Sequence, residues 1–229
     1  MTAALDEIRA EIDALDADLR ARLLRRAELV AQIGAAKAAR GTAGAPLRPM
    51  REMQQMRALR AWQRAEAPML SDAGLLAIWR EIIGMALAQQ GGVSICASQN
   101  AMALARAHFG ASLAYEAFSG TLDDLAENGR RLAVLTAAEA VAPPAGVSIF
   151  ARLPLLGKKA GTKESEPAFC YGAVADEDSD VDAVYLVRRA RALPDDDIVY
   201  EAADYVLVET ANPADDAVWG RYLTLGEPS

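Results

Sequence analysis

Residues 25–37 read RRAELVAQIGAAK, and the charges at the two ends of this stretch share one face of a helix with its apolar residues. Arg26 and Lys37 are 11 residues apart, about 1,100° of helical rotation, so they lie within about 20° of each other. Val30 and Ile33 lie between them on the same stripe. Burying an unpaired cation costs several kcal/mol, so the stripe is either wet at these positions or holds an anion.

The same periodicity extends over the first forty residues and predicts one long amphipathic helix. Its apolar residues recur at steps of three and four: Leu5, Ile8, Ile12, Leu15, Leu19, Leu23, Val30 and Ile33. A helix of this size is about 50 Å long and needs a partner along its whole length. A second helix is expected from Pro49, and a third from the N-cap Ser71 to Gly91. Residues 1–91 are therefore a predicted all-α, three-helix unit.

From Val93 onward the pattern changes to short runs of β-branched and aromatic residues. We predict strands at VSICAS, LAYEAF, RLAVL, VSIFARL, AFCYGAV, DAVYLV and DYVLVE. Helical stretches, NAMALARAHFG and TLDDLAENG, separate the first three of them. Residues 92–229 are therefore a predicted α/β domain with at least partly parallel pairing, and the polar segment 155–167 is a predicted loop.

The chain has 229 residues and a net charge of −8, which is unevenly distributed. Residues 1–91 carry 13 Lys and Arg against 11 Asp and Glu, whereas residues 92–229 carry 11 against 21. This acidic balance argues against nucleic acid as a partner, and the apolar runs are too short to span a membrane. No secretory signal is recognisable at the N-terminus. Cys96 and Cys170 are expected to be buried free thiols, so we expect a cytoplasmic protein.

Three further polar residues are candidates for the same site as Arg26 and Lys37. Glu52 aligns with apolar residues on the packed face of the second helix, and Gln90 ends the apolar stripe of the third. Arg9 precedes Arg26 by 17 residues, which is about 25 Å along the helix and about 100° around it. Arg9 therefore cannot reach the same small ligand within one chain, and it contributes only if a partner chain supplies it.

This order of residues resembles the all-helical class of chorismate mutases over residues 4–91. The similarity consists of Arg9, the pattern RxxLVxxIGxxK from Arg26 to Lys37, the pair Arg51-Glu52, and Gln90 at the end of the third helix. The resemblance implies an intertwined homodimer in which Arg9 is supplied in trans. It also implies the rearrangement of chorismate to prephenate in aromatic amino acid biosynthesis, without a metal or cofactor.

The resemblance further implies how each residue acts on chorismate, a dicarboxylate whose rearrangement is pericyclic. Arg9 of the partner and Arg26 would clamp the carboxylates, because a planar guanidinium binds them bidentately. Lys37 and Gln90 would donate hydrogen bonds to the ether oxygen, where negative charge develops. Glu52 would accept the ring hydroxyl. Catalysis would then rest on holding the compact conformer and stabilising this charge.

The substrate-binding set contains three further positions, two of which depart from the family. Arg51 is expected to help orient the site. Arg48 stands where the family usually has Asp, and it either contacts a substrate carboxylate or points to solvent. Ala86 stands where Ser is often found, and the loop at 38–47 is longer than usual. Each lost contact is expected to weaken substrate binding by about 1 kcal/mol.

Two alternative functions remain open. Isochorismate-pyruvate lyases share the helical fold and the cationic clamp, although the pair Glu52 and Gln90 favours a mutase. The second alternative is a non-catalytic helical dimerisation module, with a decayed pocket, fused to a sensor domain. The departures at Arg48 and Ala86 keep this alternative open.

The acidic second half carries weaker signals. His108 is the sole histidine of the sequence and is interpreted as a residue of a helix C-terminus, favoured there by the helix dipole. The acidic runs at 176–182 and 194–197 are interpreted as solvated turns. Residues 93–135 look faintly like the first lobe of prephenate dehydratase, whose Thr-Arg-Phe signature is missing here. We therefore expect a degenerate dehydratase-like domain that is structural or regulatory, and we hypothesise that it binds an aromatic amino acid.

Overall fold

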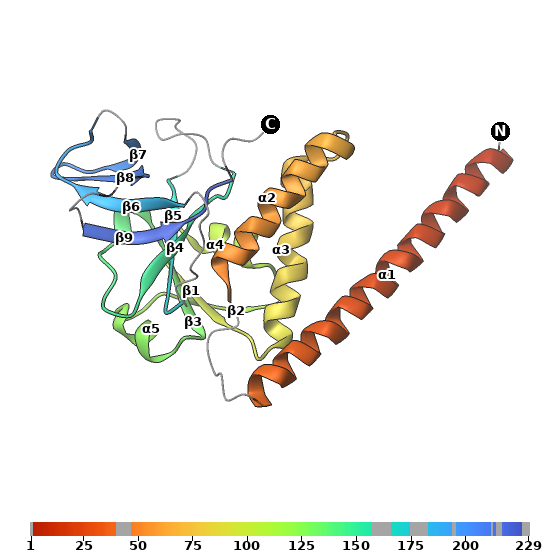
Figure 1. Cartoon of the computed structure of the whole chain (residues 1–229), viewed down its shortest axis with the longest axis horizontal. Helices are drawn as coiled ribbons and strands as arrows, with labels where there is room; N and C mark the ends of the chain where they lie inside the picture. The colour runs from red at the N-terminus through yellow and green to blue at the C-terminus, as the bar shows by residue number, and fades with distance from the viewer. Residues whose placement is uncertain are drawn as a thin grey trace. The chain divides into compact units, whose positions relative to one another are not determined.

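The structure is a computed structural model that describes residues 2–39, 47–156, 166–174, 183–193, 196–211, 213 and 217–225. The chain divides into two compact units, Met1–Ala43 and Gly44–Ser229 (Figure 1). Most of the predicted loop at 155–167, the acidic run at 176–182 and residues 194–195 lie outside the described residues.

The first unit contains the helix α1, which runs from Thr2 to Ala39 without a break and confirms the predicted long helix. Its 38 residues give a length of about 57 Å. A single helix has no core of its own, and the apolar side chains of its N-terminal half are each more than half exposed: Leu5, Ile8, Ile12, Leu15 and Leu19. Such a stripe requires a partner from outside this unit.

The second unit begins with the helices α2 (Pro49–Glu66) and α3 (Asp72–Gln89), which run antiparallel as a hairpin (Figure 1). Pro49 occupies the first turn of α2, where its missing N–H has no helical partner to lose. The Ser71 side chain caps α3 by accepting a hydrogen bond from the backbone N–H of Gly74 at 3.0 Å. Both predicted helix starts are confirmed.

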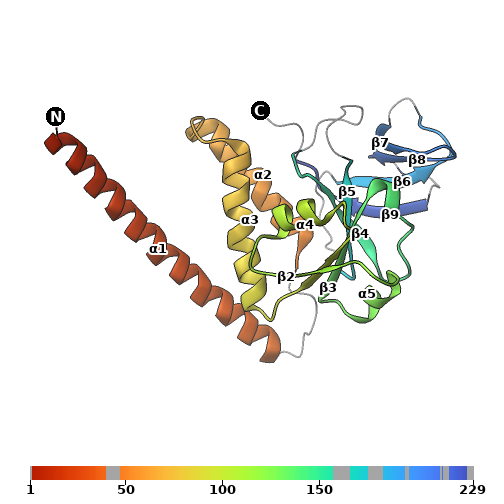
Figure 2. The ribbon, with the colours of Figure 1, turned by 180° about the vertical axis from the view of Figure 1, so that it is seen from behind.

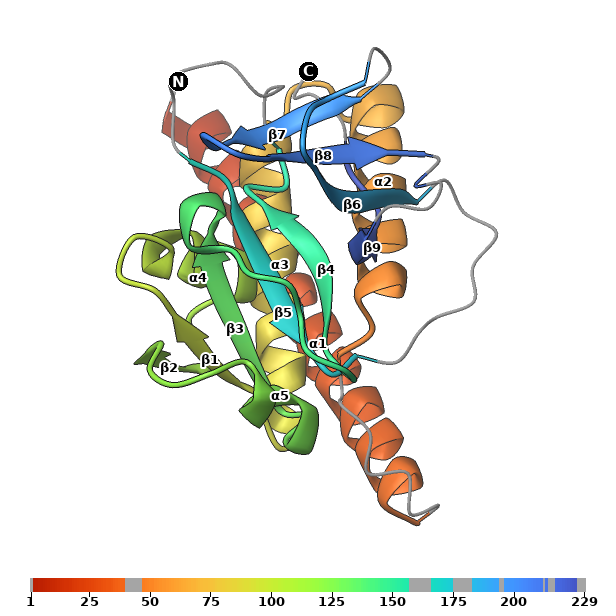
Figure 3. The same cartoon turned by 90° about the vertical axis from the view of Figure 1, so that its left-hand side faces the viewer.

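The described part of the chain after α3 forms a mixed sheet in the strand order β2-β1-β3-β5-β4-β9-β6-β8-β7. The strands are β1 (Ser94–Ala97), β2 (Ala114–Ala117), β3 (Arg131–Thr136), β4 (Ser148–Leu153), β5 (Ala168–Gly172), β6 (Val184–Arg189), β7 (Asp197–Glu201), β8 (Val206–Thr210) and β9 (Ala217–Tyr222). Strand β1 pairs in parallel with β2 and β3, and β4 with β9, while the other pairs are antiparallel. Figure 3 shows β6, β8 and β7 crossing the direction of β3, β5 and β4.

The short helices α4 (Met102–Phe109) and α5 (Asp123–Glu127) and the 3₁₀ turn η1 (Ala137–Glu139) complete the unit. All seven predicted strands and both predicted short helices are confirmed, so the expected α/β domain is present. Strands β7 and β9 were not predicted. Strand β9 contains Gly220, where a Cβ atom would lie 2.3 Å from the carbonyl oxygen of Ile149, so the β4–β9 contact requires the glycine that obscured the strand.

The hairpin and the sheet share one hydrophobic core, although residue 91 was the predicted boundary between the helical unit and the α/β domain. Met53 and Met56 of α2 and Leu87 of α3 belong to the same buried cluster as Ile95 and Phe150 of the sheet. Seen from behind, α4 lies beside α3 (Figure 2). The sheet therefore provides the inner packing surface of α2 and α3.

The end of the described chain also packs against α2. Leu223 and Leu225 are buried, and Arg57 of α2 donates a hydrogen bond to the carbonyl oxygen of Thr224 at 3.0 Å. Cys96 and Cys170 are buried free thiols, as predicted. None of the helices in the described ranges combines the length and the apolar character needed to cross a bilayer.

Candidate active site

The candidate residues fall into two groups, one in each unit. Helix α1 carries the three candidate cations Arg9, Arg26 and Lys37. Arg9 is highly exposed and pairs with Asp6 at 3.1 Å. Since α1 is continuous, the helical spacing applies: Arg26 and Lys37 share a face about 16 Å apart along the axis, and Arg9 lies about 25 Å from Arg26. The three cations thus lie at three positions along one helix, and Arg9 is the farthest from the other two.

The second group lies on the hairpin, where the structure joins Glu52 to a residue that was not predicted. The Arg80 Nη1 atom lies 3.3 Å from Glu52 Oε2, and both side chains are largely buried, at 6% and 14% exposure. A sequence signal for Arg80 did exist, because it lies on the inner apolar stripe of α3 between Leu76 and Ile83. The criterion that singled out Arg26 also applies to this residue.

Arg80 lies at the junction of the hairpin with the α/β domain. Burial lowers the pKa of Arg80, and the neighbouring Glu52 carboxylate opposes that change. The interaction of Arg80 with Cys170 of β5 connects the pair to the sheet, where burial raises the pKa of the Cys170 thiol. Arg80 Nε is a buried donor with no hydrogen-bond partner among the residues that the structure describes. The Glu52 carboxylate therefore pairs with a buried arginine that also interacts with the sheet.

His108 also faces Arg80, from the last turn of α4. Its ring packs edge-on against Phe109, with the ring centroids 4.5 Å apart. Burial, and next the charge of Arg80, hold the pKa of His108 well below its usual value of 6.5. The prediction of a helix-end residue is confirmed, but the expectation that the helix dipole favours its charge is wrong. His108 is a buried neutral imidazole.

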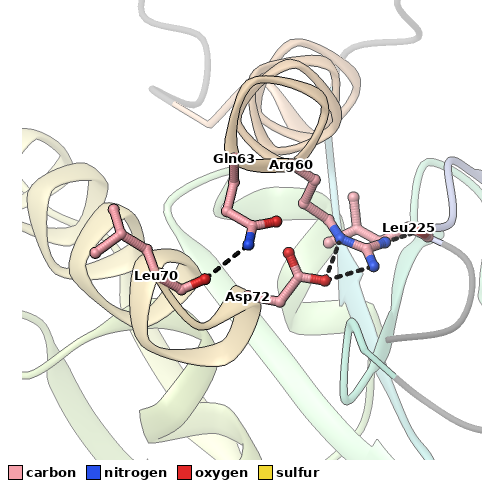
Figure 4. Close-up of polar contacts among 5 residues, drawn as sticks. All are labelled: Arg60, Gln63, Leu70, Asp72 and Leu225. Carbon is pink, nitrogen blue, oxygen red and sulfur yellow. Dashed lines mark hydrogen bonds and ion pairs between the residues drawn. The ribbon is translucent and has the colours of Figure 1, made fainter. Parts of the chain in front are cut away.

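A second buried ion pair closes the opposite end of the hairpin, as Figure 4 shows. Arg60 of α2 donates to Asp72 Oδ2 from Nε at 3.1 Å and from Nη2 at 2.7 Å, and it also bonds the carbonyl oxygen of Leu225. Gln63 donates to the carbonyl oxygen of Leu70 in the connecting loop at 2.7 Å. This end contains none of the candidate residues, so we assign it a structural role in fixing the register of α2 and α3.

Gln90 lies at the other end of α3 from Asp72. Its Nε2 atom donates to the carbonyl oxygen of Ala86 at 3.2 Å, and its own carbonyl oxygen accepts from Arg130 at 3.1 Å. Because Gln90 follows Arg80 by ten residues, it lies about 15 Å farther along α3 than the partner of Glu52. The structure thus joins Glu52 to Arg80 and places Gln90 at a different level of the hairpin.

The remaining candidates lie near these two positions. Arg48 is the N-cap residue of α2 and Arg51 lies in its first turn, and both are exposed. Ala86 is buried on α3 one turn before Gln90. The roles assigned to these residues stay predictions.

The comparisons with known proteins agree with this reading of the helices. Residues 8–91 match the model of the family described as chorismate mutase type II. No curated protein and no solved structure matches the chain. The match does not extend into the sheet, so the faint likeness of residues 93–135 to a dehydratase lobe is not confirmed. Residues 8–91, which contain most of α1 and all of α2 and α3, are therefore similar to the chorismate mutase type II family, a family of isomerases.

Proposed function

We propose that the chain is a homodimeric chorismate mutase that rearranges chorismate to prephenate in a cationic site shared between two protomers. The observation that carries this proposal is the unbroken helix α1, with Arg26 and Lys37 on one face of its C-terminal half and Arg9 near its N-terminus, inside the segment that matches the family. The free and buried state of both cysteines supports the predicted cytoplasmic location.

The lengths of the helices support the dimer. Helix α1 is about 57 Å long, whereas the 18-residue helices α2 and α3 are each about 27 Å long. A hairpin of this length is long enough to cover only about half of α1, so the proposed dimer uses a second copy to cover the other half. The outer face of the hairpin offers exposed apolar side chains for this purpose: Trp62, Ile78, Trp79 and Met85.

In such a dimer, each half of α1 serves a different site. Arg26 and Lys37 belong to the C-terminal half of the helix, and Arg9 belongs to the N-terminal half. We infer that Arg26 and the partner's Arg9 bind the two substrate carboxylates, while Lys37 donates to the ether oxygen. The cations fix the compact conformer of the substrate and stabilise the charge that develops as the C–O bond breaks.

We infer that the hairpin supplies further polar groups to the proposed site. We propose that Glu52 accepts the ring hydroxyl while Arg80 holds its carboxylate in place, and that Gln90 donates to the ether oxygen. This role of Gln90 requires its amide to leave the carbonyl oxygen of Ala86 when substrate binds. Arg51 and Arg48 stand at the exposed start of α2, where they contribute positive charge at the entrance.

The test is a direct assay that follows the loss of chorismate absorbance with the purified chain. Arg26→Ala is expected to lower kcat/KM at least about 100-fold, since charge-assisted contacts to the transition state are worth several kcal/mol. Arg25→Ala is the matched control, because Arg25 is the neighbouring arginine and pairs with Glu28 at 2.9 Å. Equal turnover by both variants would contradict the proposed site.

Assays of the purified chain with both chorismate and isochorismate distinguish the two alternative functions. Release of pyruvate from isochorismate, with no turnover of chorismate, would identify a lyase. The absence of turnover with either compound would identify a non-catalytic module.

A further inference from the structure

A cavity of about 620 Å³ lies beyond the carboxyl ends of the parallel strands β1, β2 and β3. Most of the residues that line it come from the segments that follow these strands, within 98–99 after β1, 118–123 after β2 and 139–144 after β3. Its volume lies within the range of small-molecule sites, about 300–1,000 Å³. The proposed function does not use this cavity.

The order of the strands makes this end of the sheet a favourable place for a ligand. Strand β1 lies between β2 and β3 (Figure 3). From β1 the chain passes through α4 to β2 on one side, and it then passes through α5 to β3 on the other side. Helices α4 and α5 cover opposite faces, since Ala105 of α4 and Leu125 of α5 belong to different buried clusters. The segments that leave β1 and β2 therefore diverge, and open α/β sheets bind ligands in the crevice at such a point.

The apolar wall of the cavity lies on the face of the sheet that α5 covers. Leu122 and Leu135 belong to one buried cluster, and Phe118 packs against that cluster. Ser98 lies on the same face, because it follows Cys96 of this cluster by two positions and its backbone N–H still bonds the carbonyl oxygen of Val134 at 3.0 Å. One small ligand can therefore contact these side chains from a single side of the sheet.

The charged groups of the cavity are carboxylates. Asp123 and Glu139 line it, and no Lys, Arg or His occurs among its described lining residues. Thr136 donates to Glu139 Oε2 from its backbone N–H at 3.1 Å and from its hydroxyl at 2.9 Å. The nearby Ser98 hydroxyl, and next these groups of Thr136, lower the pKa of Glu139, so its carboxylate is ionised at neutral pH. A carboxylate has about four acceptor positions, so Glu139 can accept a further donor.

A buried hydroxyl of the wall gives an independent indication of a ligand. Ser98 Oγ is buried and has no hydrogen-bond partner of normal geometry among the residues that the structure describes. Such a group is costly, so a ligand that bonds it is favoured. An ammonium group carries three N–H donors, which suit the Ser98 oxygen and the Glu139 carboxylate together. The excess of 21 Asp and Glu over 11 Lys and Arg in residues 92–229 also attracts a cation.

We propose that this cavity binds a small organic amine, in which an ammonium group is attached to an apolar body without a carboxylate. The ammonium group bonds Glu139 and Ser98, and Asp123 provides a second counter-charge. The apolar body packs against Phe118 and Leu122. An amino acid binds more weakly, since its carboxylate meets like charges and finds no cation among the described lining residues. This selectivity differs from the aromatic amino acid that the sequence suggested for the domain.

Three probes that share one body and differ in charge test the proposal by calorimetry on the full chain. We expect 2-phenylethylamine to bind with one site per chain, L-phenylalanine to bind at least about tenfold more weakly, and 3-phenylpropanoate not to bind at this cavity. Glu139→Gln should weaken 2-phenylethylamine at least about tenfold, since it removes the charge and keeps an oxygen for Thr136. Asp124→Asn is the matched control, because Asp124 pairs with Arg131 at 3.6 Å and is not among the described lining residues.

A second variant reverses the charge of the wall without removing a carboxylate. Val141 lines the cavity and is 51% exposed, so Val141→Lys introduces a cation at a position that tolerates a polar group. We expect this variant to lose 2-phenylethylamine and to gain 3-phenylpropanoate. The proposal is overturned if the wild-type chain does not bind 2-phenylethylamine, or if Glu139→Gln and Asp124→Asn weaken it equally. These results do not depend on turnover of chorismate, so they are independent of the mutase assay.

Discussion

Helix α1 and the α2–α3 hairpin belong to the same family-matched segment, yet they obtain their stability from different sources. Most of the large apolar residues of α1 are exposed, from Leu5 to Ile33, and Val30 is the exception among the described side chains. The hairpin instead packs its inner face into the core of the sheet and closes both of its ends with buried ion pairs. The comparison shows that the hairpin obtains its core from the sheet, whereas α1 has no core within its own unit.

The largest effect is expected from separating the hairpin from the sheet. In a chain ending at Gly91, Met53, Met56 and Leu87 would lose partners whose burial is worth about 1.5–3 kcal/mol for each side chain. We expect this fragment to show no cooperative thermal transition by circular dichroism. Residues 44–229, which lack α1, are expected to melt cooperatively. A transition of the 1–91 fragment equal to that of the whole chain would show that the hairpin does not need the sheet.

The next largest effect concerns the two buried ion pairs. Arg60→Met and Arg80→Met each remove the arginine of a buried ion pair and are expected to lower the free energy of unfolding by about 3–5 kcal/mol. Arg80→Met should also lower kcat/KM, because Glu52 loses the group that positions it. Denaturant titration and the chorismate assay measure the two effects. An equal loss of kcat/KM in both variants would remove the positioning role of Arg80.

If the partner of α1 is a second copy, a substitution on its apolar stripe should weaken dimer formation rather than the stability of one protomer. Leu15 is 63% exposed, so in an isolated protomer Leu15→Lys would change stability within about 0.5 kcal/mol. In the proposed dimer, the lysine is buried at an apolar interface and weakens association by about 2 kcal/mol or more. Ala17→Lys, about 200° away around α1, is the control. Light scattering after size-exclusion chromatography should find monomers for Leu15→Lys and dimers for the control.

The smallest effect is a pH dependence that arises at His108 of α4, beside Arg80 of the hairpin. The folded state holds His108 neutral, with a pKa well below 6.5, whereas the unfolded state binds a proton near that value. The contribution of His108 to stability is therefore complete above about pH 6.5 and is lost as pH falls toward the folded pKa. We expect the free energy of unfolding to fall by about 1.4 kcal/mol per pH unit below pH 6.5. His108→Gln should reduce this slope by that amount, and an unchanged slope would contradict the assignment.

The sequence predicted those elements whose signals are local. The stripe of α1, the proline at the start of α2, the Ser71 cap and seven of the strands follow from spacing and turn chemistry. Strand β7 was missed because it directly follows a run of aspartates, and β9 because Gly220 interrupts its apolar pattern.

Features that depend on contacts between residues far apart in the sequence could not be predicted in this way. The apolar stripes of α2 and α3 do not say what covers them, so the shared core with the sheet was not foreseen. Arg80 carried a usable signal, a charge on a buried stripe, but its partner Glu52 is 28 residues away in the chain. The convergence of Arg26, Lys37, Glu52 and Gln90 on one substrate remains a prediction.

The contact of α2 with the end of the chain has a consequence for synthesis. Arg57 and Arg60 bond the carbonyl oxygens of Thr224 and Leu225, which follow them by 167 and 165 residues. At about 5–20 residues per second, a ribosome needs about 8–33 s to make the intervening chain. During this interval the methionines of α2 have no completed sheet to cover them, so the nascent hairpin offers an apolar surface to chaperones until the final strand emerges.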